Sequence, residues 1–130
     1  MDLLLELTQL DDKSKNRVKV MADYGCFPLW SVEPSGPGNL DPRLLPISDE
    51  LAGALISWSK EYDQTLDQSD PQRSGFSTTQ GHGRFVETGR ALAAALGVEL
   101  GTDWSVFYFD DLTGKTKPVL SPQEPGAGRN

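Results

Sequence analysis

The segment 104–110, WSVFYFD, constrains the fold of this chain most, because five of its seven side chains are large and apolar. Successive side chains of a strand point to opposite faces, so Trp104, Val106 and Tyr108 would share one face and the two phenylalanines the other. A strand with two apolar faces is covered on both sides, which is typical of the middle of a sheet. The sequence therefore predicts a central strand here.

The residues after this strand predict a hairpin. Its turn, DLTGK, places Gly114 where a positive φ is required, and residues 115–120 would return as a further strand. Pro118 has no N–H to donate to a neighbouring strand, so this last strand should lie at an edge of the sheet.

Two amphipathic helices are predicted between the strands, at 48–66 and 84–100. Ser48 can cap the first helix, and Gly89 in the second suggests close approach of another backbone. Each helix has one apolar face that only another element can cover. The helix residues expected to pack on the central strand are Leu55, Trp58, Leu92 and Leu96.

Two more strands are predicted near the N-terminus, at 3–9 and 17–23, where apolar and polar residues alternate. They should pair as a hairpin with lysines along its outer side. The resulting order ββααββ predicts an α+β fold, a single domain in which one four-stranded mixed sheet is covered by two helices. The domain would span 1–120, and 121–130 has the composition of a disordered tail.

The charge balance limits the classes of partner. The 130 residues carry a net charge of −7, with a sequence pI of about 4.6. Proteins that bind nucleic acid or anionic membranes cluster Lys and Arg, so neither partner is expected. An acidic surface favours a basic protein partner. The N-terminus lacks the pattern of a signal peptide and Cys26 is the single cysteine, so a cytoplasmic protein, monomeric or weakly dimeric, is expected.

Motifs that would indicate chemistry are weak. TGKT at 113–116 contains the Gly-Lys-Thr of a P-loop but lacks the earlier glycine and the following helix. One histidine and one cysteine do not predict a metal site, and no cofactor is expected. A nucleophilic dyad would need Cys26 and His82 to meet, although a lone cysteine after a strand is more often a small buried residue.

The long connection 24–47 and the acidic segment after the first helix are where a partner surface is expected. Loops longer than about 15 residues are uncommon in compact domains and are often functional. Tyr and Trp anchor many protein interfaces, so the aromatic residues of this loop make it a candidate partner surface. Asp23 and Tyr24 are expected to be its exposed residues, and Trp30 to be buried beneath it. The candidate partner-binding residues are Asp23, Tyr24, Glu33, Asp41, Glu61, Asp63, Asp67 and Asp70.

Three stretches carry a resemblance to a known group of proteins: VKVMADYGCFPLW, GNLDPRLLPISDELAGALISWSKEYDQTL and FVETGRALAAALGVELGTDWSVFYFDD. The strand ending in ADY, the Leu-Trp pair and the helix entry DPRLLPISDEL resemble small acidic bacterial proteins, common in actinobacteria. These are similar to immunity partners of secreted polymorphic toxins, including those of contact-dependent growth inhibition systems. The resemblance covers about residues 17–111, and it implies no individual binding residue.

The leading hypothesis is therefore a non-catalytic immunity protein that binds a cognate toxin domain, basic and nuclease-like, and occludes its active site. Two alternatives remain open. The first is a small enzyme that uses Cys26 or a carboxylate. The second is an assembly module whose N-terminal hairpin adds a strand to another chain.

Overall fold

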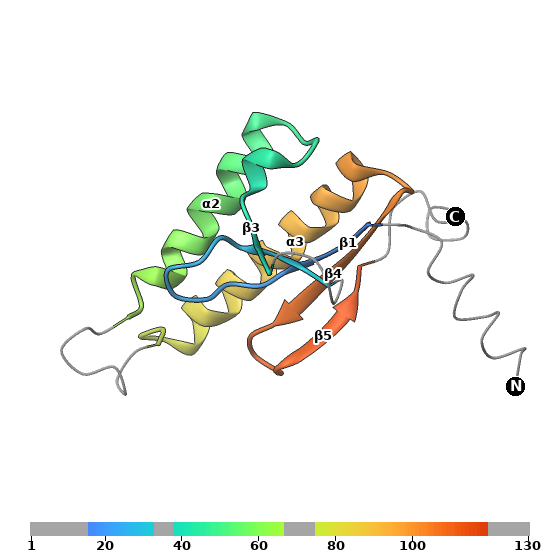
Figure 1. Cartoon of the computed structure of the whole chain (residues 1–130). Helices are drawn as coiled ribbons and strands as arrows, with labels where there is room; N and C mark the ends of the chain where they lie inside the picture. The colour runs from blue at the N-terminus through green and yellow to red at the C-terminus, as the bar shows by residue number, and fades with distance from the viewer. Residues whose placement is uncertain (1–15, 33–37, 67–74, 120–130) are drawn as a thin grey trace, which may run out of the picture.

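The computed structural model describes residues 16–32, 38–66 and 75–119 of the chain. The expected strand 3–9, the lysines at its turn and the expected tail 121–130 lie outside these residues. Figure 1 shows the elements, which in chain order are β1 (Asn16–Val20), β2 (Leu29–Ser31), β3 (Asn39–Leu40), the 3-10 turn η1 (Pro42–Leu44), α2 (Asp49–Asp63), α3 (Thr79–Leu100), β4 (Trp104–Asp110) and β5 (Lys115–Pro118).

The strands form one mixed sheet in the order β3-β2-β1-β4-β5. β1 and β4 are parallel, and the other neighbouring pairs are antiparallel. The predicted α+β class with two helices and a mixed sheet is confirmed, as are the central place of β4 and the edge place of β5. The turn between them contains Gly114 at a φ of +74°.

The predicted number of strands was wrong, because the described sheet has five strands and not four. β2 and β3 lie within the connection 24–47, which the sequence predicts to be irregular. They have three and two residues, too few for an alternating pattern to be seen. β1 is bordered by β2 and β4, so neither of its edges is left for the strand expected at 3–9.

Both helices begin at a hydroxyl cap. The Ser48 Oγ accepts a hydrogen bond from the Leu51 N–H, as predicted for α2. Glu99 on α3 reinforces this end, because its carboxylate accepts hydrogen bonds from the backbone N–H and the hydroxyl of Ser48 at 2.7 and 2.9 Å. α3 begins at Thr79, five residues before its predicted start, with Thr78 as cap. Its first turn, TQGHG, has no apolar period that could have revealed it.

The core lies between the sheet and the two helices, which cover the same face of the sheet (Figure 1). Two aromatic side chains cross it and donate to backbone carbonyls of α3. The Trp58 indole N–H bonds to the Phe85 carbonyl at 2.9 Å, and the Tyr108 hydroxyl bonds to the Val86 carbonyl at 2.8 Å. The residues that form this core are Val18, Val20, Leu29, Leu51, Leu55, Trp58, Phe85, Val86, Ala93, Leu96, Leu100, Val106 and Tyr108.

Gly89 lies where these two aromatic side chains meet α3. A methyl group at this position would lie 2.4 Å from the Trp58 ring and 2.5 Å from the Tyr108 hydroxyl. The close approach predicted at Gly89 therefore exists, but the neighbours are two side chains and not a backbone.

The second face of β4 differs from the prediction. Phe107 and Phe109 were expected to be covered like Val106 and Tyr108. Both are only half-buried, and neither belongs to the hydrophobic core or packs against it. The described part of the chain thus forms two layers, with helices on one side of the sheet.

Candidate functional site

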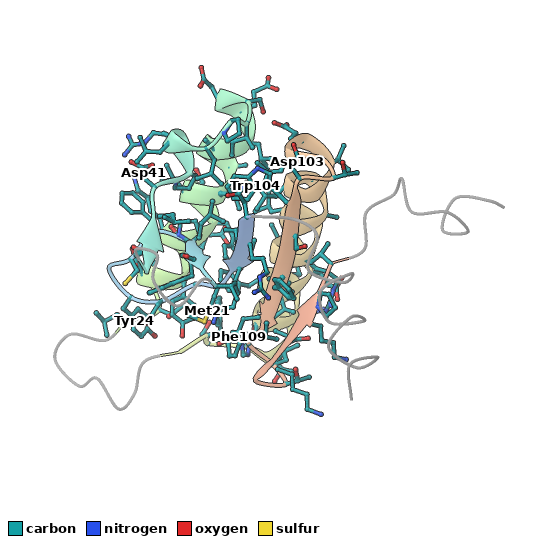
Figure 2. All side chains as sticks on the ribbon, turned by 45° about the vertical axis from the view of Figure 1, so that its right-hand side comes forward. Met21, Tyr24, Asp41, Asp103, Trp104 and Phe109 are labelled. Atoms are coloured by element: carbon teal, nitrogen blue, oxygen red, sulfur yellow. The ribbon has the colours of Figure 1, made fainter. Side chains whose placement is uncertain are left out.

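The carboxyl ends of the parallel strands β1 and β4 lie side by side, and the segments that follow them share one end of the molecule. Val20 pairs with Tyr108 in this register, so the loop after β1 and the turn after β4 leave the sheet together. Figure 2 shows Met21, Tyr24 and Phe109 at this end and Asp103 and Trp104 at the other. We call the group Asp23, Tyr24, Tyr62, Asp63, His82 and Asp111 the acidic end.

The loop 21–28 after β1 is held by its own backbone. The Met21 N–H bonds to the Pro28 carbonyl at 2.9 Å and closes the loop. A tight turn inside it joins the Cys26 N–H to the Asp23 carbonyl, and Gly25 supplies the positive φ, +71°, that this turn requires. The loop therefore presents a defined shape.

Asn39 on β3 clamps the far side of the loop. Its side-chain oxygen accepts from the Phe27 N–H at 2.8 Å, and its amide nitrogen donates to the Phe27 carbonyl at 2.7 Å. The Trp30 indole N–H donates to the Met21 carbonyl at 2.9 Å. Trp30, expected to be buried, is half-buried and fixes the start of the loop.

Tyr24 attaches the loop to the end of α2. Its ring stacks on that of Tyr62, with the centroids 4.6 Å apart, and its hydroxyl bonds to the Thr65 hydroxyl at 2.9 Å. The Asp63 carboxylate accepts from the Gly25 N–H at 2.9 Å. Tyr24 is thus half-buried, whereas Asp23 beside it is exposed as expected.

Negative charge gathers around the Tyr62 phenol. The pKa of Tyr62 is raised to about 12, first by burial and then by the charges of Asp111, Tyr24 and Asp23. Each of these charges disfavours a phenolate, because like charges repel. The Tyr62 phenol therefore lies in a negative field to which two carboxylates contribute, Asp23 in the loop after β1 and Asp111 in the turn after β4.

His82 connects this end to α3. Its Nε2 lies 2.7 Å from the Asp111 carboxylate, and its ring stacks on Phe76 with centroids 4.8 Å apart. Both members of the pair are partly exposed, at 26% and 29%. The pair joins the first turn of α3 to the residue that follows β4.

The Asp110 carboxylate accepts hydrogen bonds from other parts of the fold. Burial alone would raise its pKa, but hydrogen bonds from the Leu112 and Thr113 N–H groups and the Arg90 guanidinium together hold the pKa below its usual value. The Asp110 carboxylate therefore fixes the turn after β4 and joins it to Arg90 on α3.

The comparison with known families gives the class of the protein. The model of a family described as Serratia CdiI immunity protein-like matches residues 16–111. The chain belongs to this family. The match runs from the first residue of β1 to Asp111 and confirms the resemblance to immunity proteins of contact-dependent growth inhibition systems. No curated protein matches the chain.

Membership of the Serratia CdiI immunity protein-like family does not say which residues contact a partner, so the predicted site residues are placed by the structure. Asp23, Tyr24 and Asp63 meet at the acidic end, and Glu61 is exposed on the last turn of α2. Glu33, Asp67 and Asp70 lie outside the described residues.

Asp41 is placed elsewhere. It caps η1 and forms a two-pronged ion pair with Arg43, at 2.8 and 3.0 Å. The hydrogen bonds from the Arg43 side chain and backbone lower the pKa of Asp41. Figure 2 shows Asp41 well apart from Tyr24, so the predicted set does not form one site.

The sequence reasoning missed His82 and Asp111 as members of this end. Asp111 belongs to an acidic segment and His82 is the single histidine, so both residues were visible. Their meeting depends on the parallel β1–β4 pair and on the early start of α3.

The described residues give little support to a metal site or to a reactive thiol. No cluster of three or more His, Cys, Asp or Glu among them could hold a metal ion. Cys26 is half-buried, and its thiol lies 3.5 Å from the Tyr24 carbonyl oxygen, which is not a base that would produce a thiolate. Within residues 16–32, 38–66 and 75–119, neither helix is long and apolar enough to cross a membrane.

Proposed function

We propose that this protein binds a cognate toxin domain and neutralises it by covering the toxin's active site with the acidic end. The family is one of immunity proteins, which supports toxin neutralisation in general. The choice of surface rests on one observation: Asp23 and Asp111 lie close enough to the stacked pair Tyr24 and Tyr62 to act on the Tyr62 phenol, and Asp63 holds the loop that carries Tyr24.

The charge of this end suits a toxin that attacks nucleic acid. Such an enzyme needs a basic cleft to hold phosphate groups. Carboxylates presented together can occupy that cleft in place of phosphates, and opposite charge accelerates the encounter. The partner proposed is therefore a basic, nuclease-like domain.

The rigidity of this end supports inhibition by binding alone. The loop 21–28 is fixed by Asn39, Trp30 and the stacked tyrosines, so little conformational entropy is lost when a partner contacts it. Occlusion requires no reaction step in the inhibitor.

The test is a binding measurement with the toxin domain encoded beside this protein's gene. The double variant Asp23→Lys, Glu61→Lys reverses one exposed carboxylate of the acidic end and the exposed carboxylate that precedes Tyr62 in the sequence. We expect its association rate to fall about tenfold or more, and the salt dependence of that rate to flatten, because charge complementarity acts mainly on association.

The matched comparison is between the single variants Asp23→Lys and Asp103→Lys, each of which changes the net charge by the same amount; Asp103 is an exposed carboxylate at the opposite end of the molecule (Figure 2). The association rate of Asp103→Lys should stay within about twofold of the native value. Equal effects of the two changes would mean that net charge and not the acidic end governs binding. No complex at all between native protein and toxin would refute the proposed function.

A further inference from the structure

The face of the sheet turned away from the helices carries an unusual row of side chains. The pairing of β1, β2, β4 and β5 aligns Trp30, Lys19, Phe107 and Pro118 across four strands. None of these belongs to the core or packs against it, and both helices lie on the other side (Figure 1). We call the residues at these positions the open face: Arg17, Lys19, Trp30, Ser105, Phe107, Phe109, Thr116 and Pro118.

The charge of the open face is opposite to that of the whole chain. The chain has 19 acidic residues and a net charge of −7, yet no position of the open face is Asp or Glu. Its charged members, Arg17 and Lys19, are both basic.

Lys19 lies near the centre of this face, between Trp30 on one neighbouring strand and Phe107 on the other. It is half-buried, and no ion pair or hydrogen bond of its side chain is found among residues 16–32, 38–66 and 75–119. Arg43 and Arg90, in contrast, each pair with a carboxylate. Lys19 is therefore a cation in a row that otherwise holds apolar residues, and a carboxylate is the ligand of opposite charge that a partner seated on this row could offer it.

The open face ends at the same end of the molecule as the acidic end. β1 ends at Val20, and the loop after it carries Met21 and Asp23; β4 carries Phe107 and Phe109, and Asp111 follows its last residue. Met21 and Phe109 lie at the same end of the molecule in Figure 2. A specific interface buries about 800 Å² of each partner and involves about 20–30 residues on each side. A partner seated on the acidic end would therefore need further surface beside it, and the open face adjoins it at this end of the sheet.

We infer that the open face is the second half of the toxin interface and receives an apolar segment of the toxin whose carboxylate pairs with Lys19. This inference rests on the proposed function, since the partner is the same toxin domain. Opposite charges on adjoining surfaces admit one orientation of the partner and repel the reverse one. The aromatic side chains supply the apolar contact that hot spots require. A nucleic acid fits less well, because the acidic end would repel its phosphates.

The experiment compares two charge reversals on the same sheet against the toxin domain encoded beside the gene. Lys19→Glu changes the open face. Lys117→Glu changes a lysine of β5 that pairs with Tyr108, so it lies on the opposite face. We expect Lys19→Glu to weaken the complex about 10- to 100-fold and Lys117→Glu to alter it less than about twofold. Equal effects would overturn the inference.

Hydroxyl-radical footprinting of the native protein provides a second measurement that does not depend on a variant. Met21, Trp30, Phe107 and Phe109 should be protected in the complex, while the exposed Leu44 should stay reactive. Complete protection in the free protein would mean that the chain itself covers this face. Protection that appears only when the free protein is concentrated would mean that a second copy covers it. Either result would overturn the inference. Binding of single-stranded RNA that Lys19→Glu abolishes would also overturn it.

The outcomes separate the two proposals. If Asp23→Lys, Glu61→Lys weakens the complex but the open face still reacts with hydroxyl radicals in the complex, the acidic end contacts the toxin and the inferred role of the open face is wrong. If the native protein does not bind the toxin domain at all, the proposed function itself fails.

Discussion

The two faces of the sheet are built from alternate residues of the same strands and differ in their physical character. On the helix-covered face, Val18, Val20 and Val106 are 0%, 0% and 4% exposed and join a closed core. On the open face, Lys19 and Phe107, their neighbours in sequence, are half-buried and lie outside that core. One strand therefore provides stability with one set of side chains and, as we infer, a contact surface with the other.

This difference separates two uses of apolar residues. A side chain in the core stabilises the fold by leaving water when the chain folds. A side chain on the open face retains part of its contact with water and can release it when a partner binds. Truncations on the two faces should therefore affect different measurements.

The largest effect is expected from Leu55→Ala on α2. Leu55 is fully buried, so its truncation removes transfer free energy and leaves a cavity. We expect the free energy of unfolding in urea to fall by about 2–5 kcal/mol, with an unchanged dependence on denaturant. A loss below about 1 kcal/mol would mean that the helix-covered face is not the main core.

Gly89→Ala tests the packing of the same face from the opposite direction. Alanine favours a helix over glycine by about 1 kcal/mol, so an open site would be stabilised. Here the added methyl group would meet the Trp58 ring and the Tyr108 hydroxyl, and both side chains are held by hydrogen bonds to α3. We expect a net loss of about 1–3 kcal/mol in the same measurement.

Gly53→Ala on α2 is the matched control. A methyl group at Gly53 would meet no atom within 4 Å, so this variant should be neutral or slightly more stable. A stabilised Gly89→Ala protein would show that the contacts of Trp58 and Tyr108 with α3 are looser than described.

Elements with several residues in one pattern could be predicted from the sequence. The apolar period of α2, the two-sided run of β4 and the proline of β5 each predicted type and place. β2 and β3 could not be predicted, because they are too short and depend on the Asn39 clamp and on pairing with β1. The start of α3 was missed because its cap, Thr78, lies in a polar segment.

The acidic end could be predicted only in part. Asp23, Tyr24 and Asp63 stand out in the sequence as acidic or aromatic residues near loops. Their association with His82 and Asp111 requires the parallel pairing of β1 and β4, strands that are more than 80 positions apart in the chain. No local pattern in the sequence predicts the pairing of β1 with β4. The open face was mispredicted for a related reason: a two-sided apolar pattern does not say what covers each side.

The smallest effect is expected from Phe107→Ala, and it measures the contrast between the faces directly. A pattern of two covered faces predicts a loss of about 2–5 kcal/mol for Phe107, the same as for a core residue. Because Phe107 is half-buried and outside the core, we expect the free energy of unfolding to fall by about 1 kcal/mol, from partial loss of burial and of strand propensity. The same variant should bind the toxin domain at least about tenfold more weakly. A loss of stability equal to that of Leu55→Ala would instead make Phe107 part of a second core, and it would then not be available to a partner.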